Sequence, residues 1–136
     1  MLFRKKASKP QTRIDCLIGA GTRIDGDVTF SGGLRVDGHV AGSINGTGEG
    51  PTTLTLSEHA KVEGEIRVSH AVINGTVVGP VHVTEYLELQ EKSRVTGDVH
   101  YVSVEIHLGA VVDGQLVHGK EGSQGKVVTL KPATGD

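Results

Sequence analysis

An all-β solenoid is the fold class that this sequence predicts, and three observations predict it. One segment pattern recurs along the chain, apolar residues recur at even spacings, and 20 of the 136 residues are glycine. Recurrence at a fixed period is the signature of repeat architectures, in which each unit buries its apolar side only against its neighbours. The chain is therefore expected to form short coils stacked on one another.

The recurring pattern is an apolar residue followed ten positions later by a glycine that has an apolar residue two positions to either side. It is clearest from Leu87 to Val99, where the glycine is Gly97. Three further copies run from Leu54 to Ile66, from Val104 to Leu116 and, more loosely, from Cys16 to Val28. These four copies give the arrangement of apolar residues and glycine within one repeat. They do not yet give the length of the repeat.

The spacing of the pattern glycines predicts the length of a coil. Gly97 and Gly114 are 17 residues apart, and Gly64 and Gly97 are 33 apart, which corresponds to two coils. Gly26 and Gly64 are 38 apart, and the surplus fits the stretch 45–51, which has no apolar periodicity. Residues 16–118 therefore have room for about six coils of this length.

Apolar residues at even spacings predict strands rather than helices. Two such series are Val36, Val40 and Ile44, and Ile73, Val77, Val81 and Val83. A period of two in β-branched residues is the strand signal. Glycines interrupt the series at Gly38, Gly42, Gly75 and Gly79. A glycine in phase with a strand indicates a bend, so we expect short strands joined by glycine corners.

The composition argues against several classes of function. The single cysteine, Cys16, does not support a disulfide framework or a zinc ribbon and is compatible with a reducing cytosol. The body is acidic and lacks a basic face studded with aromatic residues, so nucleic acid is not an expected partner. The glycine-rich stretch 46–50 lacks the Gly-Lys-Ser/Thr ending of a phosphate-binding loop, so nucleotide is not expected either.

The seven histidines are the residues that most suggest a metal site. Their phases differ, since His39 follows Gly38 directly, His100 lies three residues after its pattern glycine, and His107 lies seven before Gly114. Scattered phases place them on different faces and predict no three-ligand metal site. No nucleophile and base are paired by the sequence. We therefore expect no catalytic residue, no cofactor and no enzymatic activity.

Three regions follow from these patterns: a disordered basic tail over residues 1–13, the coil domain over 14–118, and a disordered tail over 119–136. Apolar periodicity is lost after His118. The segment Val127–Leu130 is apolar enough for one more strand, but Pro132 and the polar end favour a loose tail.

The N-terminal tail is a candidate membrane-binding segment. Residues 1–13 carry five basic side chains and no acidic one, whereas the rest of the chain carries nine basic and sixteen acidic residues. The tail lacks the apolar region of a secretory signal. The candidate residues are Met1, Leu2, Phe3, Arg4, Lys5 and Lys6. Apolar tips beside cations suit an anionic membrane surface; the alternative is a tail that only keeps the chain soluble.

The two ends of the stack are candidate polymerisation interfaces. A solenoid without capping helices leaves unpaired strand edges and the cross-section of its core exposed at both ends. The candidate residues are Leu17, Ile18, Ile24, Val28 and Phe30 in the first coil, and Val104, Ile106, Val112 and Leu116 in the last. Phe30 is the best anchor, because an aromatic ring buries a large area at little entropic cost.

One enzymatic alternative stays open. Residues 18–29 read as two consecutive hexapeptides of the type seen in left-handed β-helix acyltransferases and in trimeric zinc carbonic anhydrases of that fold. Such enzymes keep the six-residue period through many turns, whereas here it fails at Phe30.

The chain also resembles the bactofilins, bacterial cytoskeletal proteins, over about residues 17–117. The resemblance depends on four segments in this order, 34–44, 60–66, 72–81 and 94–99. It implies a right-handed parallel β-helix of triangular section and polymerisation without nucleotide through the terminal coils. A departure from the family is the longer loop over residues 45–53.

The same resemblance implies a cellular location and a function. Many bactofilins attach to the inner face of the cytoplasmic membrane through a short N-terminal peptide, to which residues 1–6 are similar. The family implies a homopolymer that acts as a scaffold for cell shape or for cell-wall enzymes. The expected function is thus that of a structural protein in the cytoplasm, peripheral on the membrane.

Overall fold

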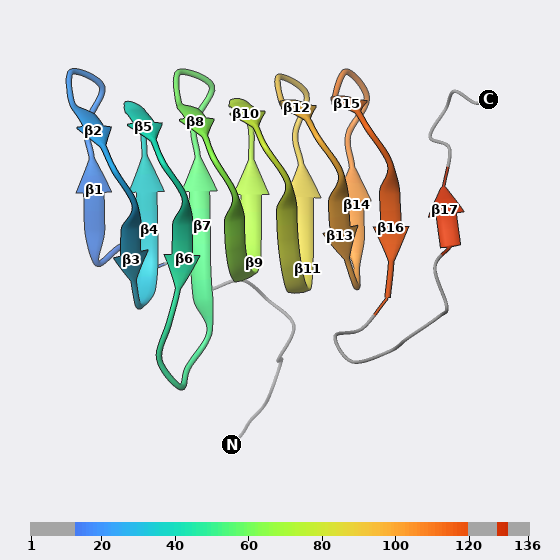
Figure 1. Ribbon diagram of the computed structural model, residues 1–136, viewed down its shortest axis with the longest axis horizontal. Helices are drawn as coiled ribbons and strands as arrows, with labels where there is room; N and C mark the ends of the chain where they lie inside the picture. The colour runs from blue at the N-terminus through green and yellow to red at the C-terminus, as the bar shows by residue number, and fades with distance from the viewer. Residues whose placement is uncertain (1–12, 120–127, 131–136) are drawn as a thin grey trace.

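The computed structural model describes residues 13–119 and the backbone of residues 128–130. Parallel strands are stacked along the long axis of the molecule, and no helix occurs in these residues (Figure 1). None of the described elements is therefore a helix able to cross a bilayer. The expected tail residues 1–12 and most of 120–136 lie outside the described residues, so their predicted disorder stays a prediction.

The strands form three faces with six parallel strands each. The first face contains β1 (Cys16–Ile18), β4 (Gly32–Val36), β7 (Thr52–Leu56), the second halves of β9 (Ile66–Ile73) and β11 (Val81–Leu89), and β14 (Val104–Ile106). The second face contains β2 (Arg23–Asp25), β5 (His39–Ala41), β8 (Lys61–Glu63), β10 (Thr76–Val78), β12 (Arg94–Thr96) and β15 (Val111–Asp113).

The third face contains β3 (Val28–Phe30), β6 (Ile44–Gly46), the first halves of β9 and β11, β13 (Val99–Tyr101) and β16 (Leu116–His118). One strand from each face makes one coil, so the chain winds through six coils. The predicted all-β solenoid of about six coils is confirmed. The surplus residues also lie where the sequence placed them, in the loop between β6 and β7 that extends beyond the other corners (Figure 1).

Columns of equivalent residues fill the interior. On the first face Leu34, Leu54, Ala71 and Leu87 are register partners in successive coils. All four side chains are at most 1% exposed. Leu54 and Leu87 begin two copies of the recurring segment, so the repeat seen in the sequence is the repeat of the coil. Burial of such stacked aliphatic side chains is the main stabilising term in this fold.

One corner of the solenoid is a column of glycines. Six stacked coils place one glycine each at the corner between the second and third faces: Gly26, Gly42, Gly64, Gly79, Gly97 and Gly114. From Gly42 onward, a Cβ atom would be directed at the carbonyl oxygen of the glycine one coil earlier. Glycine is required here because the backbones of adjacent coils approach too closely for any side chain.

The C-terminal strand differs from the sequence-based expectation. β17 (Val128–Leu130) pairs antiparallel with β16, with Leu116 opposite Leu130. The sequence assigned these residues to a loose tail, but the outer edge of β16 offers free backbone N–H and C=O groups. Pairing with that edge satisfies the backbone of a short apolar segment that has no core of its own to join.

Candidate assembly surfaces

Within the described part of the chain, the ends of the stack carry five open strand edges. At the N-terminal end, β1, β2 and β3 each pair only with a strand of the second coil. At the other end, β14 pairs only with β11 and β15 only with β12, while β16 is paired on both sides because β17 lies against it. An unpaired edge is a ready template for another chain. Among residues 13–119 and 128–130, the N-terminal end thus has three free edges and the C-terminal end two.

The residues expected at the interfaces fall into three groups that differ in solvent exposure. Leu17 and Ile106 are 58% and 41% exposed. Four others are partly buried against the core: Ile24, Val28, Val104 and Val112. Ile18, Phe30 and Leu116 are at most 8% exposed. These last three side chains belong to the inner columns of their own coils, so they support the end coils rather than present a surface.

Three exposed apolar residues of the terminal coils were missed by the sequence reasoning. Ile14 is 51%, Leu108 94% and Val111 42% exposed. A comparison of equivalent positions between coils would have found two of them. The second residue of the four-residue corners 57–60, 90–93 and 107–110 is Glu58, Glu91 and Leu108, respectively.

Val111 is likewise apolar at a position that is polar in the inner coils. Its register partners in the preceding coils are polar, namely Arg94 and then Thr76. Inner coils therefore keep these outward positions hydrophilic, and the last coil makes them apolar. Together Ile106, Leu108 and Val111 form what we call the C-terminal patch, around the corner between β14 and β15. Exposed apolar residues clustered beside free strand edges mark a protein interaction surface.

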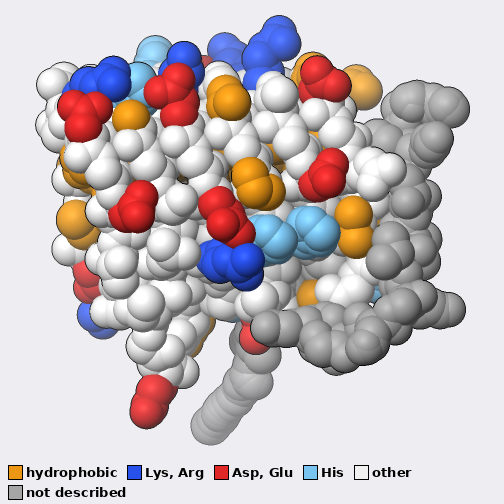
Figure 2. Space-filling view, viewed as in Figure 1, with side chains coloured by type: hydrophobic (Ala, Val, Ile, Leu, Met, Phe, Trp, Pro, Cys, Tyr) orange, Lys and Arg blue, Asp and Glu red, His pale blue; other side chains and the backbone are white. Residues whose placement is uncertain are grey.

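The sides of the solenoid are polar, by contrast. Charged side chains of both signs are interspersed over the face seen in Figure 2. Many are paired with a residue two positions away in the chain, as in Arg23 with Asp25 at 2.8 Å and Arg67 with Glu65 at 2.9 Å. Such exposed pairs contribute little to stability, but they keep the sides hydrated. Of the six exposed large apolar residues in the described part of the chain, five lie in the terminal coils and one, Val78, lies in the middle of the stack.

Two groups of histidine or carboxylate side chains meet against expectation. His82 and His100 stack with ring centroids 4.4 Å apart, because they lie 18 residues apart and occupy the same position in adjacent coils. Glu88, Glu105 and His107 place three possible ligand atoms within 4.8 Å of one another. The expectation that no three-ligand group forms is thus wrong in geometry; it considered histidines alone and overlooked carboxylates one coil away.

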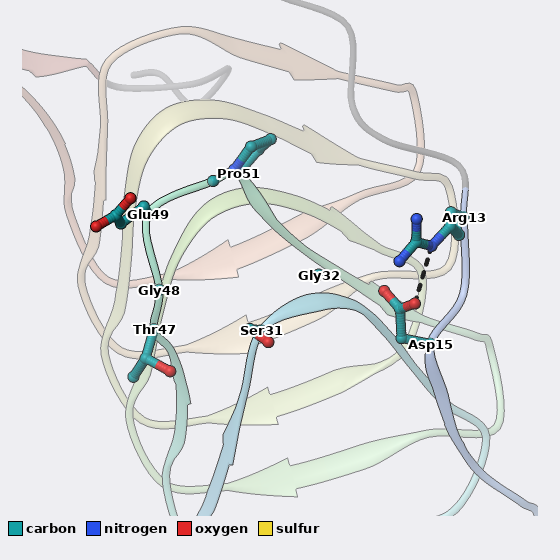
Figure 3. Close-up of a pocket in the computed structure, with 9 residues that line it drawn as sticks. Arg13, Asp15, Ser31, Gly32, Thr47, Gly48, Glu49 and Pro51 are labelled. Carbon is teal, nitrogen blue, oxygen red and sulfur yellow. Dashed lines mark hydrogen bonds and ion pairs between the residues drawn. The ribbon is translucent and has the colours of Figure 1, made fainter.

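A groove of about 560 Å³ lies beside the start of the first coil (Figure 3). Arg13 and Asp15 lie on one side and the loop from Thr47 to Pro51 on the other. Asp15 accepts hydrogen bonds from the backbone N–H of Gly33 and from Arg13 Nε, and these two bonds lower the pKa of its carboxyl. Through its bond to Gly33 that carboxylate holds the first coil to the second, and since both of its oxygens are already bonded we assign it no catalytic role.

Ser69 and His70 form the described contact most like a nucleophile and base. Ser69 Oγ lies 2.8 Å from His70 Nδ1, but its hydroxyl donates to the carbonyl oxygen of Thr52 at 3.0 Å. The His70 side chain is buried, and that burial lowers its pKa. Ser69 is partly exposed, but its hydroxyl is engaged with Thr52 and the His70 ring is buried, so we assign the pair no catalytic role.

The described geometry defines a class of protein, a parallel β-solenoid with hydrophilic sides and apolar, strand-edged ends. The family model described as "Bactofilin: Polymer-forming cytoskeletal" matches residues 16–117. The chain belongs to the bactofilin family. This match favours a structural protein over the hexapeptide enzymes that the sequence left open.

A curated relative agrees with this assignment. The chain is 28% identical to Bactofilin BacP of Myxococcus xanthus (strain DK1622) over 133 residues, which cover 98% of this chain and 53% of that protein. The chain thus spans about half the length of this relative. No solved structure matches the chain.

Proposed function

We propose that the protein assembles without nucleotide into filaments, by stacking of its terminal coils, and serves as a structural scaffold rather than an enzyme. The observation that carries the proposal is the distribution of apolar surface. Inner coils have charged or polar residues at the positions that Leu108 and Val111 occupy in the last coil. Stacking one end on another would hide the C-terminal patch and satisfy the free strand edges together.

The direct test is negative-stain electron microscopy of the purified chain in buffer free of nucleotide. Filaments with a lateral dimension of one or a few solenoids are expected, and their length is expected not to change on addition of ATP or GTP. Discrete particles at all protein concentrations, or filaments that require nucleotide, would contradict the proposal.

We further propose that the filaments lie on the inner face of the cytoplasmic membrane and hold cell-wall enzymes or other clients there. The support is the composition of residues 1–6, three of which are basic and two of which, Leu2 and Phe3, are large and apolar. Each basic residue near an anionic leaflet contributes about 1 kcal/mol, and burial of each apolar side chain adds about 1.5–3 kcal/mol at most. One tail binds weakly, whereas a filament with many tails binds strongly.

Deletion of residues 1–6 is expected to release filaments from anionic liposomes and to leave polymerisation intact. Co-sedimentation with vesicles that contain phosphatidylserine measures the first effect, and electron microscopy measures the second. Deletion of residues 131–136 is the matched control, because it removes six residues that include one basic side chain and no large apolar one. Full co-sedimentation of the N-terminal deletion would show that the tail is not the anchor.

A further inference from the structure

Glu88 and Glu105 lie side by side on the outside of the first face. They are register partners in the parallel strands β11 and β14. Like charges directly opposite each other on neighbouring strands repel and destabilise a sheet. His107, two residues beyond Glu105, places its Nε2 atom 3.3 Å from Glu88 Oε2 and 3.0 Å from Glu105 Oε2. A single imidazole thus faces both carboxylates.

Neighbouring side chains fix the orientation of both carboxylates. Tyr86 Oη donates a hydrogen bond to Glu105 Oε1 at 2.9 Å, and Gln90 Nε2 donates one to Glu88 Oε2 at 2.9 Å. The Glu88 side chain is 19% exposed, which is low for an acidic residue on the side of the solenoid. Partners that bond to ligating groups in this way orient them and tune a metal site.

The two distances from the imidazole to the carboxylates match those between ligands of one metal ion. Zinc binds histidine nitrogen and carboxylate oxygen at about 2.0–2.2 Å, so two ligand atoms of a tetrahedral site are about 3.3 Å apart. The two distances from His107 Nε2 to the carboxylate oxygens, 3.3 and 3.0 Å, are close to this value. One imidazole and two carboxylates leave a fourth position for water, and the imidazole favours transition-metal ions over Mg²⁺ or Ca²⁺.

We propose that Glu88, Glu105 and His107 bind a divalent transition-metal ion of the zinc class. The ion neutralises the two opposed carboxylates and links β11 of the fifth coil to β14, the last strand of its face. It would thereby fasten the terminal coil, whose strand β14 pairs with no other described strand than β11. This inference is independent of the proposed assembly, since all three ligands come from one chain.

The test is isothermal titration calorimetry with zinc chloride at pH 7.5 on the untagged full chain in which Cys16 is replaced by Ser. The exposed thiol of Cys16 would otherwise offer a second ligand for zinc. We expect one equivalent of zinc to bind. His107→Ala and Glu88→Gln should each weaken the affinity at least about tenfold. Binding should also weaken as the pH falls from 7.5 to 5.5, because the metal competes with a proton for the imidazole.

Two other histidine variants are the matched controls. His100→Ala removes one ring of the stacked pair on the third face, and His39→Ala removes the partner of Glu63 on the second face. Both should bind zinc as the parent does. Circular dichroism will verify that each variant is folded. Absence of binding to the parent, or binding that survives His107→Ala and is lost in His100→Ala, would overturn the proposal.

Discussion

Replacement of Leu108 by Arg is expected to convert filaments into discrete dimers. Leu108 is 94% exposed at the corner of the last coil, beside Ile106 and Val111. A guanidinium there would lie unpaired in a desolvated contact, at a cost of several kcal/mol per interface. The N-terminal ends remain free to stack, so assembly should stop at two subunits. Size-exclusion chromatography and negative-stain electron microscopy measure the outcome.

Val78→Arg is the control for this substitution. Val78 is also an exposed aliphatic residue, 43% exposed, but it lies on β10 in the middle of the stack. Filaments should persist in this variant. The combination of Leu108→Arg with Leu17→Arg should give monomers, since each charge blocks one end. Filaments in the double variant, or their loss in Val78→Arg alone, would point to lateral assembly.

Exposure decides which residues can test the interface. Leu116 and Phe30 were both candidates for the interface on sequence grounds, and either could be chosen for a blocking charge. Their side chains are 1% and 8% exposed, so a charge at either position acts on the coil itself. A variant that loses filaments because its end coil unfolds says nothing about contacts between subunits. Leu108 and Leu17 avoid this ambiguity.

The fold was predictable because every coil repeats the same physical requirement. A position that faces the interior must be aliphatic, and the corner between the second and third faces must be glycine, so spacing alone predicts the number of coils. Val36, Val40 and Ile44, which recur at even spacings in the sequence, all point into the interior and are fully buried. The loop between β6 and β7 was predictable for the opposite reason, since its residues follow no inward pattern.

Features that depend on single coils were not predictable in this way. β17 pairs with an edge that exists only because the stack ends at β16, and no periodicity marks that edge. The group of Glu88, Glu105 and His107 joins two coils, and its members are recognised only when the register between β11 and β14 is known. The C-terminal patch was visible in principle, because Leu108 and Val111 depart from the polar residues at the same positions of inner coils.

Gly97→Val is expected to destabilise the fold by more than about 3 kcal/mol, and two physical effects combine to do so. The backbone φ of Gly97 is 138°, a region that a β-branched residue occupies at a cost of about 1–3 kcal/mol. In addition, a Cβ atom at this position would lie 2.6 Å from the carbonyl oxygen of Gly79. That oxygen belongs to the backbone of the preceding coil, which cannot move without disturbing the pairing of β10 with β12.

Gly26→Val separates the two effects, because Gly26 has nearly the same φ, 134°, but no atom within 4 Å of an added Cβ. Urea unfolding followed by circular dichroism, in the Leu17→Arg, Leu108→Arg background so that contacts between subunits do not contribute, measures both variants. Gly26→Val should lower the free energy of unfolding only by the cost of backbone strain, and Gly97→Val should lower it clearly more. Equal losses would mean that the coils shift apart freely at this corner, and that the column of glycines is required by backbone conformation rather than by the close approach of the coils.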